Sequence, residues 1–229
     1  MVDVGALLDP MNELETLLGL EIDAIFSSVS GFDDAGAQRW VTEAYPEVFT
    51  PYAAAASDLS VSWYNHAAPQ LVFQAIPLLL PEPQSLAANV AWAFANHAAT
   101  HLLRGAAQRD LWNVARQTVQ ENADREDGAK WARHASANAC RFCQMLSTRG
   151  PVYASKQSAG RVAETAGLVS DGHKYHRNCH CMAVPVRPGG TYEPPGYVDG
   201  WTQDYFRARE LAGSGDVAEI MAAYRQLDK

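Results

Sequence analysis

The sequence lacks the features of a membrane-spanning or exported protein. Its longest apolar run, from Ala75 to Pro81, is far shorter than the roughly 20 residues that a helix needs to cross a bilayer. Residues 1–20 carry four acidic side chains and no basic stretch, which argues against a secretory signal peptide. We therefore expect a soluble protein that is made in a reducing cytoplasm.

The motifs of several common catalytic sites are also missing. The chain contains no P-loop, no informative GxGxxG and no GxSxG, so neither a phosphate cradle nor a hydrolase elbow is indicated. His97 and His101 are four residues apart, but Ala98 stands where a zinc protease has its general-base glutamate. Polar residues on a helix surface are the better interpretation of this pair.

What the sequence does have is a globular composition with an uneven charge. It has 229 residues, 48% of them hydrophobic, with 6 Trp and 9 Tyr, which suffices for the core of one or two domains. The formal charge is −8, yet residues 127–190 hold nine basic and three acidic side chains, a charge of +6 against −14 for the rest. This division suggests two regions with different partners, although two ordinary solvated faces would also explain it.

Apolar periodicity predicts a mainly α fold. Pro46 is expected to end or kink the second helix, and Thr50 followed by Pro51 to start the third. The apolar stretch 70–81, interrupted by prolines, is expected to form a buried connector or a short helix. A break is expected near Gly105, with Asp110 capping the next helix. The predicted N-terminal helices cover 11–28, 34–45, 51–69, 86–105 and 111–124.

Three regions follow from this pattern. Residues 1–126 form a helical partner-docking region, 127–190 a small irregular α+β module stapled by a metal, and 191–229 an extended linker with a C-terminal helix. Within the module we expect a helix over 130–146 and a short strand over 182–186. Thr202 or Asp204 is expected to cap the C-terminal helix, which Gly213 and Gly215 weaken.

The module contains every cysteine of the chain. Four cysteines and four of the seven histidines gather there as a CxxC pair and an HxxCxC cluster. Tetrahedral zinc binds four such nitrogen or sulfur ligands. One candidate tetrad of ligands is the four cysteines. In the other tetrad, His176 replaces either Cys179 or Cys181. The sequence alone does not decide between the two tetrads. The candidate metal ligands are Cys140, Cys143, His176, Cys179 and Cys181.

Other chemical roles for these residues have less support in the sequence. Two disulfides would need an oxidising compartment, which the cytoplasmic expectation disfavours. A redox CxxC would need a surrounding βαβ pattern, which is not seen. A nucleophilic pair of Cys140 with His176 would need an orienting acid, and the spacing supplies none.

The same residues carry a resemblance to a known family. The strings ACRFCQML, from Ala139, and HRNCHCMAV, from His176, resemble the MuF-like minor capsid proteins, named after phage Mu protein F. The signature is a CxxC followed by an HPxCRC-type box, from which this chain departs at Arg177 and His180. The flanking residues are similar to the actinobacteriophage branch, and the resemblance covers about 50 of the 229 residues.

The resemblance implies a structural minor capsid protein in the interior of a tailed-phage head. Its partners would be the portal, the major capsid or scaffold protein and packaged double-stranded DNA, with no membrane. The acidic helical region would dock on a protein, and the basic module would contact phosphates through Arg141, Lys174 and Arg177.

Some relatives in actinophage genomes are linked to a head maturation protease, which supplies the alternative function. Such an enzyme would need a nucleophile and a base, for which Ser136, Ser147, Ser155 and His134 are available. No elbow or strand context presents these side chains, so a protein without enzymatic activity is the expectation.

Overall fold

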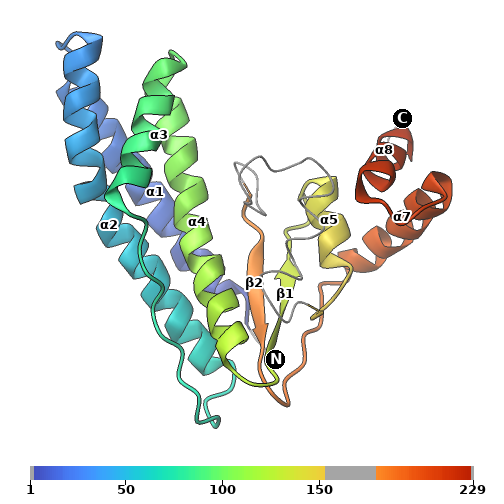
Figure 1. The fold of residues 1–229 in the computed structure, drawn as a ribbon. Coiled ribbons are helices and arrows are strands. Elements are labelled where there is room, and N and C mark those ends of the chain that lie inside the picture. Colours follow the sequence, from blue (N-terminus) through green and yellow to red (C-terminus); the bar gives the residue numbers. More distant parts are fainter. Residues whose placement is uncertain (1–2, 153–178, 228–229) are drawn as a thin grey trace. The chain divides into compact units, whose positions relative to one another are not determined.

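The computed structural model describes residues 3–152 and 179–227. These residues are mainly α, as predicted, and contain one two-stranded sheet (Figure 1). None of the helices in these residues is long and apolar enough to span a membrane. The helices are α1 (Gly5–Ser28), α2 (Asp34–His66), α3 (Pro83–Ala95), α4 (Ala99–Arg125), α5 (Arg141–Ser147), α7 (Tyr197–Ala212) and α8 (Val217–Leu227). The strands are β1 (Lys130–His134) and β2 (Met182–Val186).

Contacts divide the chain into two compact units. The helical unit comprises residues 3–63 and 75–118, and the mixed unit comprises 64–74 together with the described residues from 119 onward. Helices α2 and α4 therefore contribute residues to both units. The region boundaries at 126 and 190 stay predictions from the sequence.

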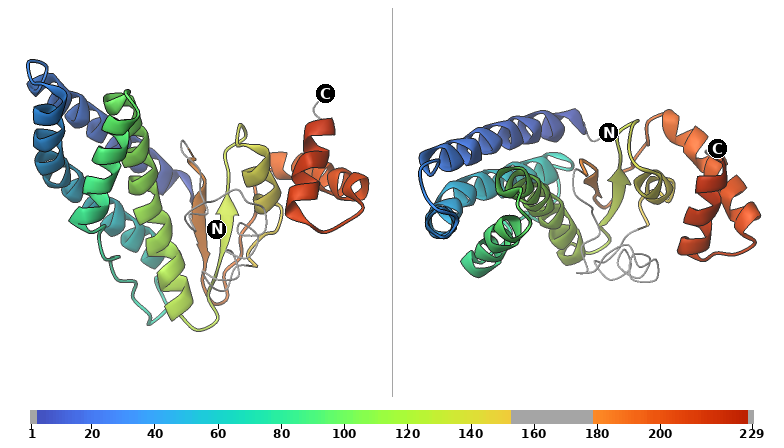
Figure 2. Two further views of the ribbon diagram at one scale, coloured as in Figure 1. Left: turned by 45° about the horizontal axis from the view of Figure 1, so that its top comes forward. Right: turned by 90° about the horizontal axis from the view of Figure 1, so that it is seen from above.

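In the helical unit, α1 and α2 lie side by side, as do α3 and α4 (Figures 1 and 2). The amphipathic pattern predicted for α1 is confirmed, since Leu18 and Ile22 are fully buried. Leu17 on the same helix is 43% exposed and lies outside this buried stripe. The carboxylate of Glu15 accepts a 2.6 Å hydrogen bond from the indole of Trp112, which ties α1 to α4.

The helix end predicted at Pro46 and the new helix predicted from Pro51 are wrong, because α2 runs unbroken through both prolines. Each proline removes a backbone donor and costs the helix about 3 kcal/mol. The buried side chains along the same helix offset this cost, since burying one large apolar side chain contributes about 1.5–3 kcal/mol. Those that are fully buried over this stretch are Val41, Tyr45, Phe49 and Ala53.

The connector between α2 and α3 is not helical and is largely exposed, contrary to the prediction, although Ala75 is buried. Val72 is 97% exposed and Leu79 is 92% exposed. Its prolines disfavour a helix, and the backbone is held instead by a side chain, since the Leu78 amide donates a 2.8 Å hydrogen bond to the Ser57 hydroxyl.

The predicted interruption at Gly105 is also wrong. Helix α4 continues through Gly105 and Asp110, because the residues on either side of the glycine, such as Leu103 and Ala107, are packed in the core. The chain breaks earlier, at His97, whose φ of 57° does not continue a right-handed helix. His97 therefore lies outside both flanking helices, whereas His101 lies within α4.

The mixed unit is built on β1 and β2, which pair antiparallel from Lys130 opposite Val186 to His134 opposite Met182. The strand predicted over 182–186 is confirmed. The helix predicted over 130–146 is wrong for its first part, because β2 is buried along its whole length and needs a strand partner for its backbone groups. Only Arg141–Ser147 is helical.

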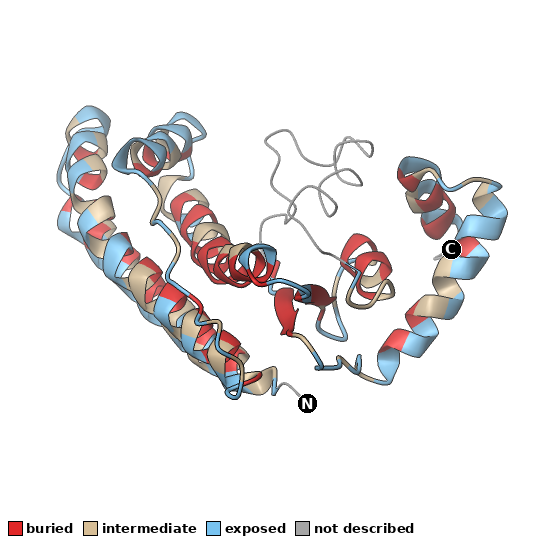
Figure 3. Cartoon of the chain, turned by 60° about the horizontal axis from the view of Figure 1, so that its bottom comes forward, coloured by how far each residue is buried: buried red, intermediate tan, exposed pale blue. Residues whose placement is uncertain are grey.

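Two C-terminal helices replace the single one expected. Helix α7 ends at Gly213, which has a φ of 66° and so suits the left-handed position that closes a helix. Both α7 and α8 pack on α5 through one apolar cluster, and Figure 3 shows α5 and the two strands as mostly buried. Its largest members are Phe142, Met145, Leu146, Ile220 and Tyr224.

Candidate metal centre

The sheet brings the two cysteine clusters together. Cys140 directly precedes α5 and Cys143 lies in its first turn, whereas Cys179 and Cys181 directly precede β2. His134 ends β1 opposite Met182, which starts β2. Because the strands are antiparallel, the chain leaving β1 toward α5 starts beside the chain entering β2. Strand pairing thus explains how residues almost forty positions apart meet.

The thiols form a compact group. The sulfur atoms of Cys143, Cys179 and Cys181 all lie within 4.8 Å of one another, and those of Cys143 and Cys179 are 3.6 Å apart. Cys140 is not one of this group of three, but a side-chain hydrogen bond links it to Cys143. All four cysteines are free, since a disulfide would need about 2.04 Å between sulfurs. The buried group of Cys143, Cys179 and Cys181 could hold a metal ion.

Mutual hydrogen bonding and burial raise the pKa values of Cys143 and Cys181 and keep these two thiols protonated. Hydrogen bonds with the three other cysteines, followed by burial, raise the pKa of Cys143. The hydrogen bond with Cys143 lowers the pKa of Cys181, but the hydrogen bond with Cys179 and burial outweigh it and raise this pKa to about 12. A metal ion must displace the protons to bind, so its affinity would rise with pH.

Apolar side chains from several elements cover the thiols. Ala135 after β1, and Val198 and Trp201 on α7, form one buried cluster with three of the cysteines. The Tyr197 hydroxyl donates a 2.8 Å hydrogen bond to the carbonyl of Ala135, which ties α7 to the end of β1. Such a shell limits access of water and lowers the local dielectric constant around a bound ion.

Sequence reasoning missed Arg133 at this centre. This residue is in the middle of β1 and only 1% exposed, and its Nη1 atom lies 3.8 Å from the sulfur of Cys143. Its charge also lowers the pKa of Cys181. The spacing of Arg133 from the CxxC pair carried no signal, because the proximity depends on how α5 packs against β1.

The histidines of the region differ in their surroundings. His134 places its Nδ1 atom 3.1 Å from the hydroxyl of Tyr192, and burial lowers its pKa from the ordinary 6.5. His180 is exposed between two buried cysteines. The predicted ligand His176 lies outside the described residues, so the choice between the two tetrads stays open at that position.

Arg141, predicted to contact DNA, is engaged within the protein. Its Nη1 atom lies 3.0 Å from the carboxylate of Asp204 on α7 and 2.9 Å from the side-chain oxygen of Gln144. Its guanidinium also stacks 5.5 Å from the ring centre of Tyr224 on α8. Arg141 therefore anchors α5 to both C-terminal helices. Lys174 and Arg177 lie outside the described residues.

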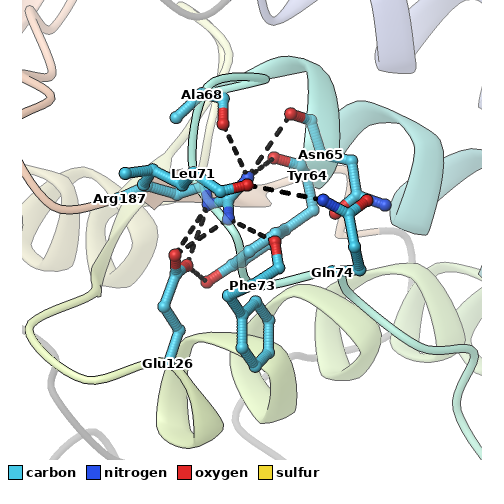
Figure 4. Close-up of polar contacts among 8 residues, drawn as sticks. All are labelled: Tyr64, Asn65, Ala68, Leu71, Phe73, Gln74, Glu126 and Arg187. Atoms are coloured by element: carbon cyan, nitrogen blue, oxygen red, sulfur yellow. Dashed lines mark hydrogen bonds and ion pairs between the residues drawn. The ribbon is translucent and has the colours of Figure 1, made fainter.

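Arg187 is likewise an internal residue. It follows β2 directly, is 2% exposed, and forms an ion pair with Glu126 at 2.8 Å (Figure 4). Together with buried Arg133, this shows that the charge of +6 counted over 127–190 overstates the positive charge that a partner can reach.

The side chains proposed for a protease have other partners. The Ser147 hydroxyl is buried and donates a 2.8 Å hydrogen bond to the carbonyl of Cys143. Ser136 donates to the side chain of Asn138, and Ser155 lies outside the described residues. Since His134 contacts Tyr192, the contacts of these described side chains do not form a nucleophile and base pair.

A comparison with known proteins identifies the family of the chain. The VG15 protein family matches residues 2–208, which is most of the chain. The match indicates a phage-associated family. No curated protein and no solved structure matches the chain. The chain belongs to the VG15 protein family.

Proposed function

We propose that this protein is a structural minor capsid protein in the interior of a tailed-phage head, acting in head morphogenesis. The family match over residues 2–208 carries the proposal. The spacing of the cysteine clusters supports it, because it resembles that of MuF-like minor capsid proteins. The buried thiol group is consistent with a small module whose fold is fixed by an ion rather than with an enzyme.

The charges of the two units suggest how the protein would bind its partners. The helical unit holds thirteen acidic and four basic residues, a net charge of −9. Such a surface favours a basic partner and repels nucleic acid. We infer that the helical unit docks on a basic surface of the portal, capsid or scaffold protein. The mixed unit would then face packaged DNA.

We also propose that the thiol group binds a structural zinc ion. Zinc bound by thiolates at about 2.3 Å in a tetrahedron places the sulfurs about 3.8 Å apart. The 3.6 Å between Cys143 and Cys179 is close to this value. Cys140 is the proposed fourth ligand, because a hydrogen bond links it to Cys143; in the alternative tetrad His176 replaces Cys179 or Cys181.

Elemental analysis of the purified protein tests the zinc site. One zinc per chain is expected, and it should be lost from Cys140→Ser but retained by His176→Ala. Loss from both Cys140→Ser and His176→Ala would instead support the tetrad in which His176 replaces Cys179 or Cys181. A folded wild-type chain with no zinc, purified without chelator, would refute the site.

The capsid role is tested in the parent phage. We expect mass spectrometry of gradient-purified particles to find the protein in heads that lack tails as well as in complete virions. Deleting the gene should yield fewer DNA-filled heads, and supplying the protein in trans should restore them. Absence of the protein from purified heads would contradict the proposal. Normal capsid processing in the deletion would exclude the protease alternative.

A further inference from the structure

Arg133 occupies an unusual position for a cationic side chain. It is 1% exposed within β1 and paired with Ala183 on β2, so strand pairing fixes its backbone. Arginine stays protonated even when buried. Its guanidinium donates toward the sulfur of Cys143 at 3.8 Å, the cysteine that contacts all three others. A permanent positive charge is therefore built in beside the thiol group.

This charge suits metal-bound thiolates better than free thiols. Four thiolates around a divalent ion carry a net charge of −2, and three thiolates with a neutral histidine carry −1. In either case a buried anion needs compensation from nearby cations or hydrogen-bond donors. A guanidinium within hydrogen-bond reach of a ligating sulfur supplies both at once.

We propose that Arg133 is the positioning residue of this centre, donating a hydrogen bond to the metal-bound Cys143 thiolate and balancing its charge. The proposal rests on the zinc site proposed above. Arg133 acts through Cys143 and does not bind the ion. Outer partners of this kind orient a ligand and tune how tightly it holds the metal. The same contact should make the bound thiolate less reactive toward alkylating reagents.

The test compares Arg133→Met with Arg133→Lys, and uses Arg187→Met as a control. Arg187 is an equally buried arginine of the mixed unit, but it pairs with Glu126. Each chain is loaded with zinc for chelator competition and with cobalt for absorption spectroscopy. Iodoacetamide then measures thiolate reactivity.

Arg133→Met should weaken metal affinity about tenfold or more. It should also shift the thiolate-to-cobalt charge-transfer band to lower energy and speed alkylation, because the sulfur lone pair loses its cation. Arg133→Lys should recover most of the band position and affinity. Arg187→Met should destabilise the fold but leave the band of the folded, cobalt-loaded protein unchanged.

An unchanged band and affinity in Arg133→Met would overturn the proposal. So would equal losses in Arg133→Met and Arg187→Met without rescue by lysine. If Arg133→Met does not fold, Arg133→Lys and Arg133→Gln replace it, and equal bands in these two variants would also overturn it. A wild-type chain that binds no metal refutes the zinc site and this role together, whereas a metal-loaded chain insensitive to Arg133 refutes this role alone.

Discussion

Both carboxylate oxygens of Glu126 accept hydrogen bonds from the buried guanidinium of Arg187, each at 2.8 Å. The Tyr64 hydroxyl donates to the same carboxylate at 2.7 Å. The guanidinium also donates to the carbonyls of Ala68, at 3.1 Å, and Phe73, at 2.7 Å. Within the mixed unit, this one side chain joins the residue after β2 to the end of α4 and to segment 64–74, as Figure 4 shows.

Glu126→Gln should therefore be strongly destabilising. The substitution leaves a buried arginine without its counter-charge, which costs about 3–5 kcal/mol. Urea unfolding of the full chain measures the loss. The control is Glu121→Gln, which removes the half-buried partner of exposed Arg125 and should cost less than about 1 kcal/mol. Equal losses in the two variants would show that the buried pair contributes no more than the surface one.

Cys143→Ser should damage the centre more than Cys140→Ser. Cys143 is buried and contacts the three other cysteines, whereas Cys140 lies at the exposed edge. When the free concentration of an ion is about 100 times its dissociation constant, binding stabilises the folded protein by about 2.7 kcal/mol. Both variants should lose the bound zinc and a contribution of that size, but Cys143→Ser also places a hydroxyl in the buried apolar cluster and should be the less stable of the two, as thermal unfolding with and without chelator would report. A Cys140→Ser chain that loses more stability than Cys143→Ser would contradict this order.

The stability of the metal-free protein should fall in mild acid because of His134. Burial lowers the pKa of this histidine from 6.5, so the unfolded chain binds a proton that the folded chain resists. The contribution is fully present above pH 6.5 and is lost as the pH falls toward the lowered pKa. Urea midpoints between pH 7.5 and 5 measure it.

His134→Asn should remove this component of the pH dependence. Tyr192→Phe should keep it, because desolvation rather than the hydroxyl contact causes the shift. A wild-type profile identical to that of His134→Asn would show that His134 titrates normally in the folded state.

The sequence predicted helix identity better than helix ends. The apolar stripe of α1 and the valine-rich strand β2 were both recognisable, because each buries one regular pattern. The prolines at 46 and 51 led to a wrong prediction of a helix end, since tertiary packing of α2 outweighs the local preference of proline against a helix interior. Residues 130–134 were wrongly predicted as helix for a similar reason. They form a strand because β2 lies beside them and pairs with them.

The sequence likewise predicted some parts of the candidate metal centre and missed others. Cysteine spacing alone predicted that the two clusters meet, and three of the four cysteines lie together in the buried group. The roles of Arg133 and Trp201 were not predictable, because they depend on strand register and on the packing of α7. Counting charges also failed to show that Arg133 and Arg187 face inward.

The two arginines and one lysine assigned to DNA, Arg141, Arg177 and Lys174, should contribute differently to DNA retention. Lys174→Gln and Arg177→Gln should each lower the salt dependence of binding by about one unit of slope, as expected for a phosphate contact. Arg141→Gln should change the slope less and lower stability, because Arg141 pairs with Asp204 and stacks on Tyr224. Salt titrations of fluorescent duplex DNA measure the slopes, with exposed Arg39→Gln in the acidic helical unit as the control. Binding that is absent at low salt, or slopes that Arg39→Gln lowers as much as Arg177→Gln, would remove DNA from the partners and leave the protein contacts alone.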